Sequence, residues 1–251
     1  MRIDDGLAIL ELEPNVPNVT GTIYPVLVWD DKNTVLIDTG LPGQSETLLE
    51  LIKNEGVQPE KIDTIIITHH DMDHIGSLAP IVKWINTKNN GECTVQVLSH
   101  EIEKPYIQSE KLPIKFTKEI LEEMQKQLAK LSPEQQKEYK STFSENKPEV
   151  TGIVNHQQVL PLCGGIRILH TPGHTPGHIC IYLEKYKTLV AGDVLTVRDG
   201  RLSGPFVDQT YDMVQAKKSL ATLLDLDIEG IICFHGGLAV EEIKSIITEY
   251  L

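Results

Sequence analysis

The chain has 251 residues, and its 36 acidic and 23 basic side chains give a formal net charge of −13. This length is enough for one large hydrophobic core, while the negative charge argues against nucleic acid or an anionic membrane surface as a partner. No apolar run approaches the roughly 18 residues of a membrane span, and the start Met1-Arg2-Ile3-Asp4-Asp5 has no signal-peptide pattern, so we expect a cytoplasmic protein.

Two segments that alternate strand-like and helix-like patterns flank a different middle. In the first segment we expect strands at 24–29, 34–37, 64–68 and 94–98, and helices at 45–53 and 78–85. In the second we expect strands at 165–170, 178–184, 187–191 and 230–234, and helices at 212–224 and 239–250. The similar halves predict one α/β domain, residues 1–251, of two packed sheets with helices outside.

Residues 101–150 differ from both halves. They contain ten Glu and nine Lys but no Asp, Arg or Gly. Apolar side chains fall on one helical face of this segment: Phe116, Ile120, Leu121, Met124, Leu128 and Leu131. We interpret the segment as a helical insertion, which is either a hairpin packed on the body or a lid over an active site.

The densest chemical signal is Thr68-His69-His70-Asp71-Met72-Asp73-His74, which follows the apolar run Ile65–Ile67. Imidazole and carboxylate are groups that bind zinc, iron and manganese. Burying such groups without a partner would cost on the order of several kcal/mol, and a cation removes that cost. Because the preceding run predicts a buried strand, a metal site is favoured over a solvated acidic loop.

Three further candidate ligands follow other predicted strands. His174 lies in Thr171-Pro172-Gly173-His174-Thr175-Pro176-Gly177-His178, where the Pro-Gly pairs predict a rigid turn. Asp193 closes the run Leu189–Gly192, and His235 stands between Phe234 and a Gly-Gly pair. Since each candidate ends a strand, the loops can bring these side chains together.

These motifs, in this order over about residues 20–240, resemble the metallo-β-lactamase superfamily, whose first motif is similar to Leu36-Ile37-Asp38-Thr39-Gly40. The resemblance implies an αββα four-layer sandwich with a dinuclear metal site at one edge. It also implies that Asp38 orients a ligand. The implied ligands are His69, Asp71 and His174 for one metal, Asp73, His74 and His235 for the other, and Asp193 as a bridge between both.

One position departs from the common pattern of the family. Asp71 stands where most members have a second His, although the flavodiiron branch has Glu there. Carboxylate is a harder ligand than imidazole and should shift the preference toward iron or manganese relative to zinc. We expect two divalent metal ions, zinc first, with iron or manganese as alternatives because of Asp71. His70 is an alternative ligand if the loop is shifted by one residue.

The chemistry that this site implies is hydrolysis of a small-molecule substrate. Two cations roughly 3.5–4 Å apart lower the pKa of a shared water toward neutrality. Asp73 is the expected catalytic residue, because it can bind metal and also orient the water or receive its proton. We expect a carbonyl substrate: an ester, a thioester, or a lactone such as an acyl-homoserine lactone.

The alternative function is that of a non-haem di-iron oxidoreductase or dioxygenase, which the carboxylate of Asp71 favours. The sequence leaves a homodimer open.

The cysteines are interpreted as core residues of a protein in a reducing compartment. Cys93, Cys163, Cys180 and Cys233 lie singly among apolar residues and show no CxxC spacing. Cys180 and Cys233 are less favoured alternatives as soft metal ligands.

Other histidines and aromatic residues have weaker functional claims. His178 is expected to brace its turn or cap a strand, and His100 and His156 are expected to be exposed. Tyr106 and Phe116 are candidates for lining a substrate pocket, as is Tyr211.

Overall fold

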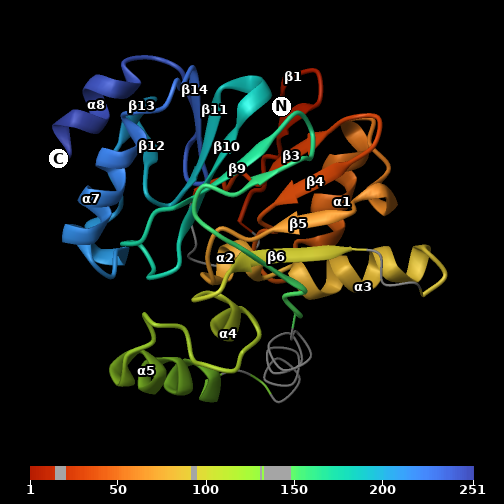
Figure 1. The fold of residues 1–251 in the computed structure, drawn as a ribbon. Coiled ribbons are helices and arrows are strands. Elements are labelled where there is room, and N and C mark those ends of the chain that lie inside the picture. The colour runs from red at the N-terminus through yellow and green to blue at the C-terminus, as the bar shows by residue number, and fades with distance from the viewer. Residues whose placement is uncertain (15–20, 92–94, 131, 133–147) are drawn as a thin grey trace.

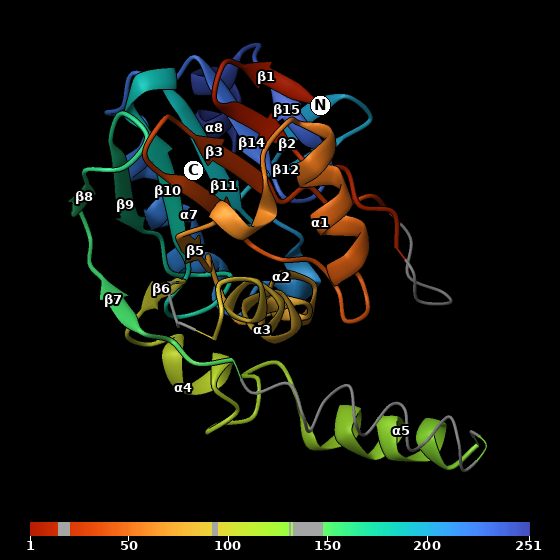
Figure 2. The ribbon, with the colours of Figure 1, turned by 90° about the vertical axis from the view of Figure 1, so that its right-hand side faces the viewer.

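The computed structural model describes residues 1–14, 21–91, 95–130, 132 and 148–251. Within these residues two mixed β-sheets pack face to face, with helices on both outer faces (Figure 1). The view turned by 90° shows the same layers from the side (Figure 2). The predicted αββα fold is therefore confirmed.

The first sheet contains seven strands among the described residues. In spatial order they are β1 (Arg2–Asp4), β2 (Leu7–Ile9), β3 (Val26–Trp29), β4 (Thr34–Ile37), β5 (Thr64–Ile66), β6 (Gln96–His100) and β7 (Gly152–Val154). Strands β1 to β4 pair antiparallel, and β4 to β7 pair parallel. The sequence did not predict β1, β2 and β7, because three residues are too few for a periodic pattern.

The second sheet contains six strands within the described part of the chain. In spatial order they are β15 (Gly237–Ala239), β14 (Gly230–Cys233), β11 (Thr188–Gly192), β10 (Ile179–Leu183), β9 (Ile166–His170) and β8 (Val159–Leu160). Only the β11–β14 pair among them is parallel. A separate hairpin joins β12 (Thr196–Arg198) to β13 (Arg201–Ser203).

Helices cover the outer face of each sheet (Figure 1). The larger ones are α1 (Ser45–Asn54) and α3 (Leu78–Lys88) on the first sheet, and α7 (Met213–Leu223) and α8 (Ile243–Glu249) on the second. The last helix begins later than predicted, because residues 237–239 form β15. Short helical turns are α2 (Met72–Ile75), α4 (Lys104–Ile107), η1 (Pro59–Lys61), η2 (Glu184–Tyr186) and η3 (Val207–Gln209). No helix among the described residues is long and apolar enough to cross a bilayer.

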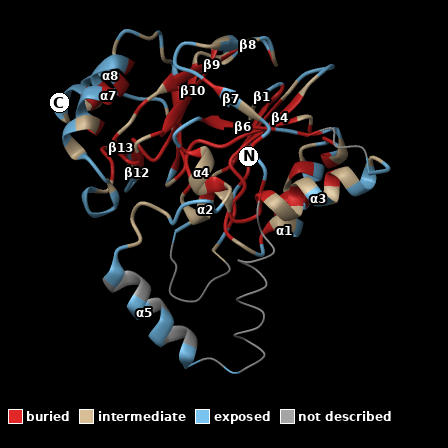
Figure 3. Ribbon diagram, turned by 60° about the horizontal axis from the view of Figure 1, so that its bottom comes forward, coloured by how far each residue is buried: buried red, intermediate tan, exposed pale blue. Residues whose placement is uncertain are grey.

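Alternation along the strands builds the layered core. On β4, Val35 and Ile37 pack between the two sheets, while Leu36 packs toward α1 and α3. On β9, Ile168 faces the other sheet and Leu169 faces α7. Each such side chain contributes about 1.5–3 kcal/mol when fully buried. The buried residues accordingly concentrate in the sheets and on the inner sides of the helices (Figure 3).

Backbone hydrogen bonds join the two sheets at one edge. Ile179 N donates to Thr68 O at 3.1 Å, and Tyr24 N donates to Phe234 O at 3.0 Å. Thr68 follows β5 of the first sheet, and Phe234 follows β14 of the second. The loops after these strands, which carry the predicted ligands, are thereby held next to one another.

The predicted insertion at 101–150 is described only in part. Helix α5 (Lys118–Ala129) lies apart from the sandwich in both ribbon views (Figures 1 and 2). Residues 131 and 133–147 lie outside the described residues, as do the side chains at 120, 121, 124 and 128. The predicted apolar face of the insertion therefore stays a prediction.

Candidate metal centre

All predicted ligands converge at the edge where the two sheets are joined. They form two groups, and in each group one ligand atom per residue lies within 4.8 Å of the others. The groups are His69, Asp71, His174 and Asp193, and Asp73, His74 and His235.

The short helix α2 positions the first ligand loop. After β5 ends, His69 and Asp71 precede this helix, and Asp73 and His74 lie on its single turn. His74 N donates to Asp71 O at 2.9 Å, which closes the turn. The turn directs Asp73 and His74 to one group of ligands, and His69 and Asp71 to the other.

Asp193 lies between the two groups. Its Oδ1 is 3.3 Å from Nε2 of His74, and its Oδ2 is 3.4 Å from Nε2 of His174 and 3.3 Å from Nε2 of His235. Its side chain is almost completely buried. One carboxylate therefore faces histidines of both groups, as a bridging ligand would.

The other two carboxylates each face one group. Oδ2 of Asp71 lies 2.9 Å from Nε2 of His174 and 3.3 Å from Nε2 of His69. Oδ2 of Asp73 lies 3.2 Å from Nε2 of His235. This division matches the two ligand sets that the resemblance implied.

Among the described residues, four buried side-chain atoms of this site lack a hydrogen-bond partner: His69 Nε2, His74 Nε2, His174 Nδ1 and Asp193 Oδ1. Buried polar atoms are normally paired, and lone pairs of imidazole and carboxylate are what a divalent cation accepts. The residues present therefore fit a pair of metal ions.

A family comparison agrees with this geometry. The family model described as the metallo-beta-lactamase superfamily matches residues 20–235. The chain belongs to this superfamily. Membership and the two His/Asp groups together make it a metal-dependent hydrolase.

Curated relatives of this superfamily member include enzymes and uncharacterised proteins. It is 28% identical over 234 residues to the probable metallo-hydrolase YflN of Bacillus subtilis, covering 86% of this chain and 80% of the relative. It is 27% identical over 220 residues to the hydroxyacylglutathione hydrolase GloC of Haemophilus influenzae, covering 84% of each.

Solved structures share the fold. A metallo-beta-lactamase family protein from Thermus thermophilus aligns with a TM-score of 0.69 and 23% identity, covering 98% of this chain and 78% of that one. A metallo-beta-lactamase from Cronobacter sakazakii aligns with a TM-score of 0.68 and 15% identity, covering 100% of this chain and 93% of that one.

Residues outside the ligand set brace the site of this superfamily member. Nε2 of His178 accepts a hydrogen bond from Asp193 N at 3.1 Å, and its Nδ1 lies 2.9 Å from Oγ1 of Thr171. Gly192 has φ +52°, and a Cβ there would lie 2.5 Å from Nε2 of His178. The predicted bracing role of His178 is confirmed, and a glycine is needed beside it.

His70 is directed away from the two ligand groups. Its backbone N donates to Oε2 of Glu103 at 2.9 Å, and its Nδ1 contacts the same oxygen. Oε1 of Glu103 accepts hydrogen bonds from Thr175 Oγ1 and Gly177 N, both at 2.8 Å. The alternative of His70 as a ligand is therefore not supported, and Glu103 instead ties the two ligand loops together.

The sequence missed Glu103 and a second residue of the insertion, Lys115. The ammonium of Lys115 contacts Oδ2 of Asp71 and lies 2.7 Å from Nε2 of His174. No local pattern could have marked either residue, because residues 101–150 contain ten Glu and nine Lys.

Opposite charges and burial shift the pKa values within the centre. Burial and the neighbouring His74 hold the pKa of His69 well below its usual value. Burial also opposes a charge on His235, but Asp193 and Asp73 outweigh it and raise that pKa to about 10. Burial would raise the pKa of Asp193, but the nearby imidazoles, His235 first, hold it well below its usual value. Metal ions would compete with protons for the same lone pairs.

Two pockets meet at the ligand loop. The larger, about 590 Å³, reaches Asp193 and His235 and is lined by apolar side chains that include Tyr24, Val197 and Phe206. The smaller, about 230 Å³, is lined by Asp71, Met72, Asp73, Pro113, Lys115, Phe116 and Gln209. A substrate in this cleft would thus contact both the sandwich and the insertion.

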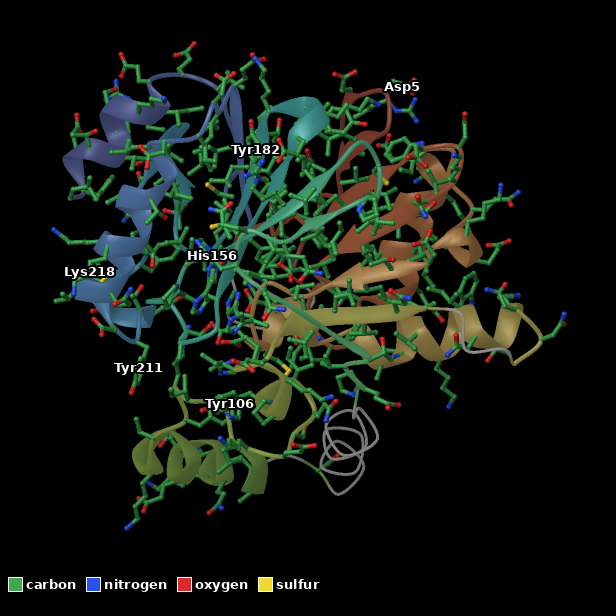
Figure 4. All side chains as sticks on the ribbon, viewed as in Figure 1. Asp5, Tyr106, His156, Tyr182, Tyr211 and Lys218 are labelled. Atoms are coloured by element: carbon green, nitrogen blue, oxygen red, sulfur yellow. The ribbon has the colours of Figure 1, made fainter. Side chains whose placement is uncertain are left out.

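The remaining predictions have mixed outcomes. Phe116 lines a pocket, whereas Tyr106 on α4 stacks on His70 and Tyr211, before α7, is 59% exposed (Figure 4). His156 is exposed as predicted, but His100 is buried, because its ring stacks on that of His170.

The described cysteines lie in the core as predicted. Cys163 packs between the sheets, and Cys180 and Cys233 pack under α7 and α8. Burial raises the pKa of Cys163 and Cys180 to about 12. Cys93 lies outside the described residues.

Proposed function

We propose that this superfamily member uses a dinuclear centre to hydrolyse a small carbonyl compound with an activated water. The observation that carries the proposal is the place of Asp193, whose carboxylate faces histidines of both ligand groups. Two divalent ions held there would polarise a carbonyl and lower the pKa of a water toward neutrality. Zinc is the first candidate, and Asp71 keeps manganese and iron as alternatives.

The role proposed for Asp73 is to hold the attacking water and receive its proton. Its side chain is 25% exposed, whereas that of Asp193 is 4% exposed. Asp73 lines both pockets, and its Oδ2 lies 3.2 Å from Nε2 of His235. A carboxylate that reaches both the ligand group and the cleft is suited to general-base work.

Esters, thioesters and lactones are the proposed substrate class. The larger pocket offers apolar walls for an acyl group beside the ligand loop. The hydroxyacylglutathione hydrolase names among the relatives favour including thioesters. The acyl-homoserine lactone remains one member of this class.

The proposal is tested by loading the purified protein separately with zinc, manganese and iron. Each form is assayed against esters, thioesters, lactones, β-lactams and phosphodiesters, and its metal content is measured. We expect two ions per chain, hydrolysis of at least one carbonyl class, loss of activity with a chelator, and recovery on adding metal. Hydrolysis of phosphodiesters alone would contradict the carbonyl assignment.

A second candidate is a non-haem di-iron oxidoreductase, favoured by the carboxylate of Asp71 in a position facing two histidines. This candidate predicts iron in the protein purified without chelator and an absorption spectrum that responds to oxygen. A zinc-loaded form that hydrolyses as fast as the iron-loaded form would exclude it.

A further inference from the structure

The segment that carries Lys115 is attached to the ligand loop. Ile114 N donates to Nε2 of His70 at 3.3 Å, while Nδ1 of His70 contacts the carboxylate of Glu103. Glu103 is completely buried, and the ring of His70 stacks on Tyr106 at 4.5 Å between centroids. Lys115 is therefore held beside the candidate metal centre by contacts that lead through His70 to the buried Glu103.

The ammonium of Lys115 lies inside the cleft. Its side chain is 25% exposed, and Nζ contacts Asp71 and His174. Among the described residues that line the two pockets, it is the one lysine or arginine. A nearby lysine, Lys118, has a side chain that is 85% exposed and pairs with Glu122 on the same helix. The position of Lys115 thus differs from that of an ordinary surface lysine.

A loaded centre would compete with Lys115 for the partners that it contacts in the cleft. If Asp71 and His174 serve as ligands, a metal ion would take the lone pair of His174 Nε2 and one of the lone pairs of Asp71 that now face Lys115. The ammonium, which lines the 230 Å³ pocket, could then pair with an anion held there. An anion there would gain a charge-assisted hydrogen bond from a partly buried ammonium.

We propose that Lys115 binds a carboxylate of the substrate, so that the enzyme selects acyl compounds with a carboxylate a few bonds from the hydrolysed carbonyl. This inference rests on the proposed hydrolase function. The carbonyl lies at the ligand groups, and the carboxylate lies in the smaller pocket between Lys115 and Phe116. A charge-assisted hydrogen bond from the ammonium fixes the orientation of the substrate.

The test compares two chromogenic esters, mono-para-nitrophenyl glutarate and its neutral methyl ester. The proteins are the metal-loaded wild type, Lys115→Met, Lys115→Arg and the control Lys118→Met. We expect Lys115→Met to lower kcat/KM for the glutarate about ten- to a hundredfold, as for loss of a hydrogen bond to a charged group, with little change for the methyl ester. Lys115→Arg keeps part of the preference, and Lys118→Met matches the wild type.

Metal content and glutarate binding separate this inference from the proposed function. We expect Lys115→Met to keep its two ions and to bind glutarate about tenfold more weakly or worse in calorimetry. Equal losses on both esters, or loss of metal, would overturn the inference, because Lys115 would then support the centre itself. If the wild type hydrolyses neither ester, the role of Lys115 is still decided by the ratio of the glutarate dissociation constants of Lys115→Met and the wild type.

Discussion

Oδ2 of Asp38 lies 2.8 Å from Nδ1 of His74, and the same carboxylate accepts hydrogen bonds from Thr68 N and Oγ1. The contact places the proton of the neutral imidazole on Nδ1, so that Nε2 presents its lone pair toward Asp193. Asp38 has φ +60°, a conformation that Asp and Asn tolerate better than most residues. Both its backbone and its side chain thus serve the orientation of His74.

Replacing Asp38 tests this orientation. Asp38→Asn keeps the size and tolerates the backbone conformation, but it removes the charge that holds the Nδ1 proton. We expect metal affinity to fall about 10–100-fold, as for other groups that orient a metal ligand, with a small change in the unfolding midpoint. Asp38→Ala should show the same loss of metal together with lower stability. Unchanged metal affinity in Asp38→Asn would contradict the assigned role.

Asp193 and Asp71 should differ in their effects on the metal centre. Asp193 faces both ligand groups, so we expect Asp193→Ala to lose both ions and all hydrolytic activity. Asp71 faces one group, so Asp71→His should keep part of the activity and shift the preferred metal toward zinc. Elemental analysis and assays with each metal measure both effects. Full activity in Asp193→Ala would exclude a bridging role.

Gly192 provides a test of the brace behind Asp193. In Gly192→Ala the new Cβ would lie 2.5 Å from Nε2 of His178 and would displace the hydrogen bond to Asp193 N. We expect lower metal content and a loss of stability. Gly56→Ala is the matched control, because Gly56 also has positive φ but a Cβ there meets nothing within 4 Å. The control should show only the conformational strain of about 1–2 kcal/mol and keep its metal. Equal metal content in Gly192→Ala and Gly56→Ala would argue against a disruptive clash between the new Cβ and His178.

The buried ring of His100 should contribute to acid sensitivity. Burial and the stacked His170 lower the pKa of His100 below 6.5 in the folded protein. The unfolded chain therefore takes up a proton at His100 more readily, and the resulting stability is present above pH 6.5 and is lost as the pH falls below it.

This prediction is measured as the free energy of unfolding in urea of metal-free wild type and His100→Gln between about pH 8 and pH 5.5. We expect the wild type to lose stability relative to the variant on acidification, because the glutamine does not titrate. Parallel pH dependence of the two proteins would show that His100 does not contribute.

Much of the sandwich could be inferred from the sequence, and the side chains predicted as ligands lie together in the structure. Strands such as β4, β9 and β11 have apolar runs bounded by turn residues, and the alternation of core-facing residues is a local property. Each candidate ligand lies in the loop or short helical turn after a strand, so the edge of the fold where it lies followed from its position in the chain. Asp193 illustrates this, since it comes directly after Gly192 at the end of β11.

Only the tertiary structure decided which other side chains reach the centre. Glu103 meets His70 across 33 positions of sequence, and Lys115 meets Asp71 across 44. No periodic pattern distinguishes these two residues from the other Glu and Lys of the insertion. Their roles come from burial and from the position of the insertion against the ligand loops. The same reason explains why His70, adjacent in sequence to a predicted ligand, is directed to Glu103, and why His100 is buried.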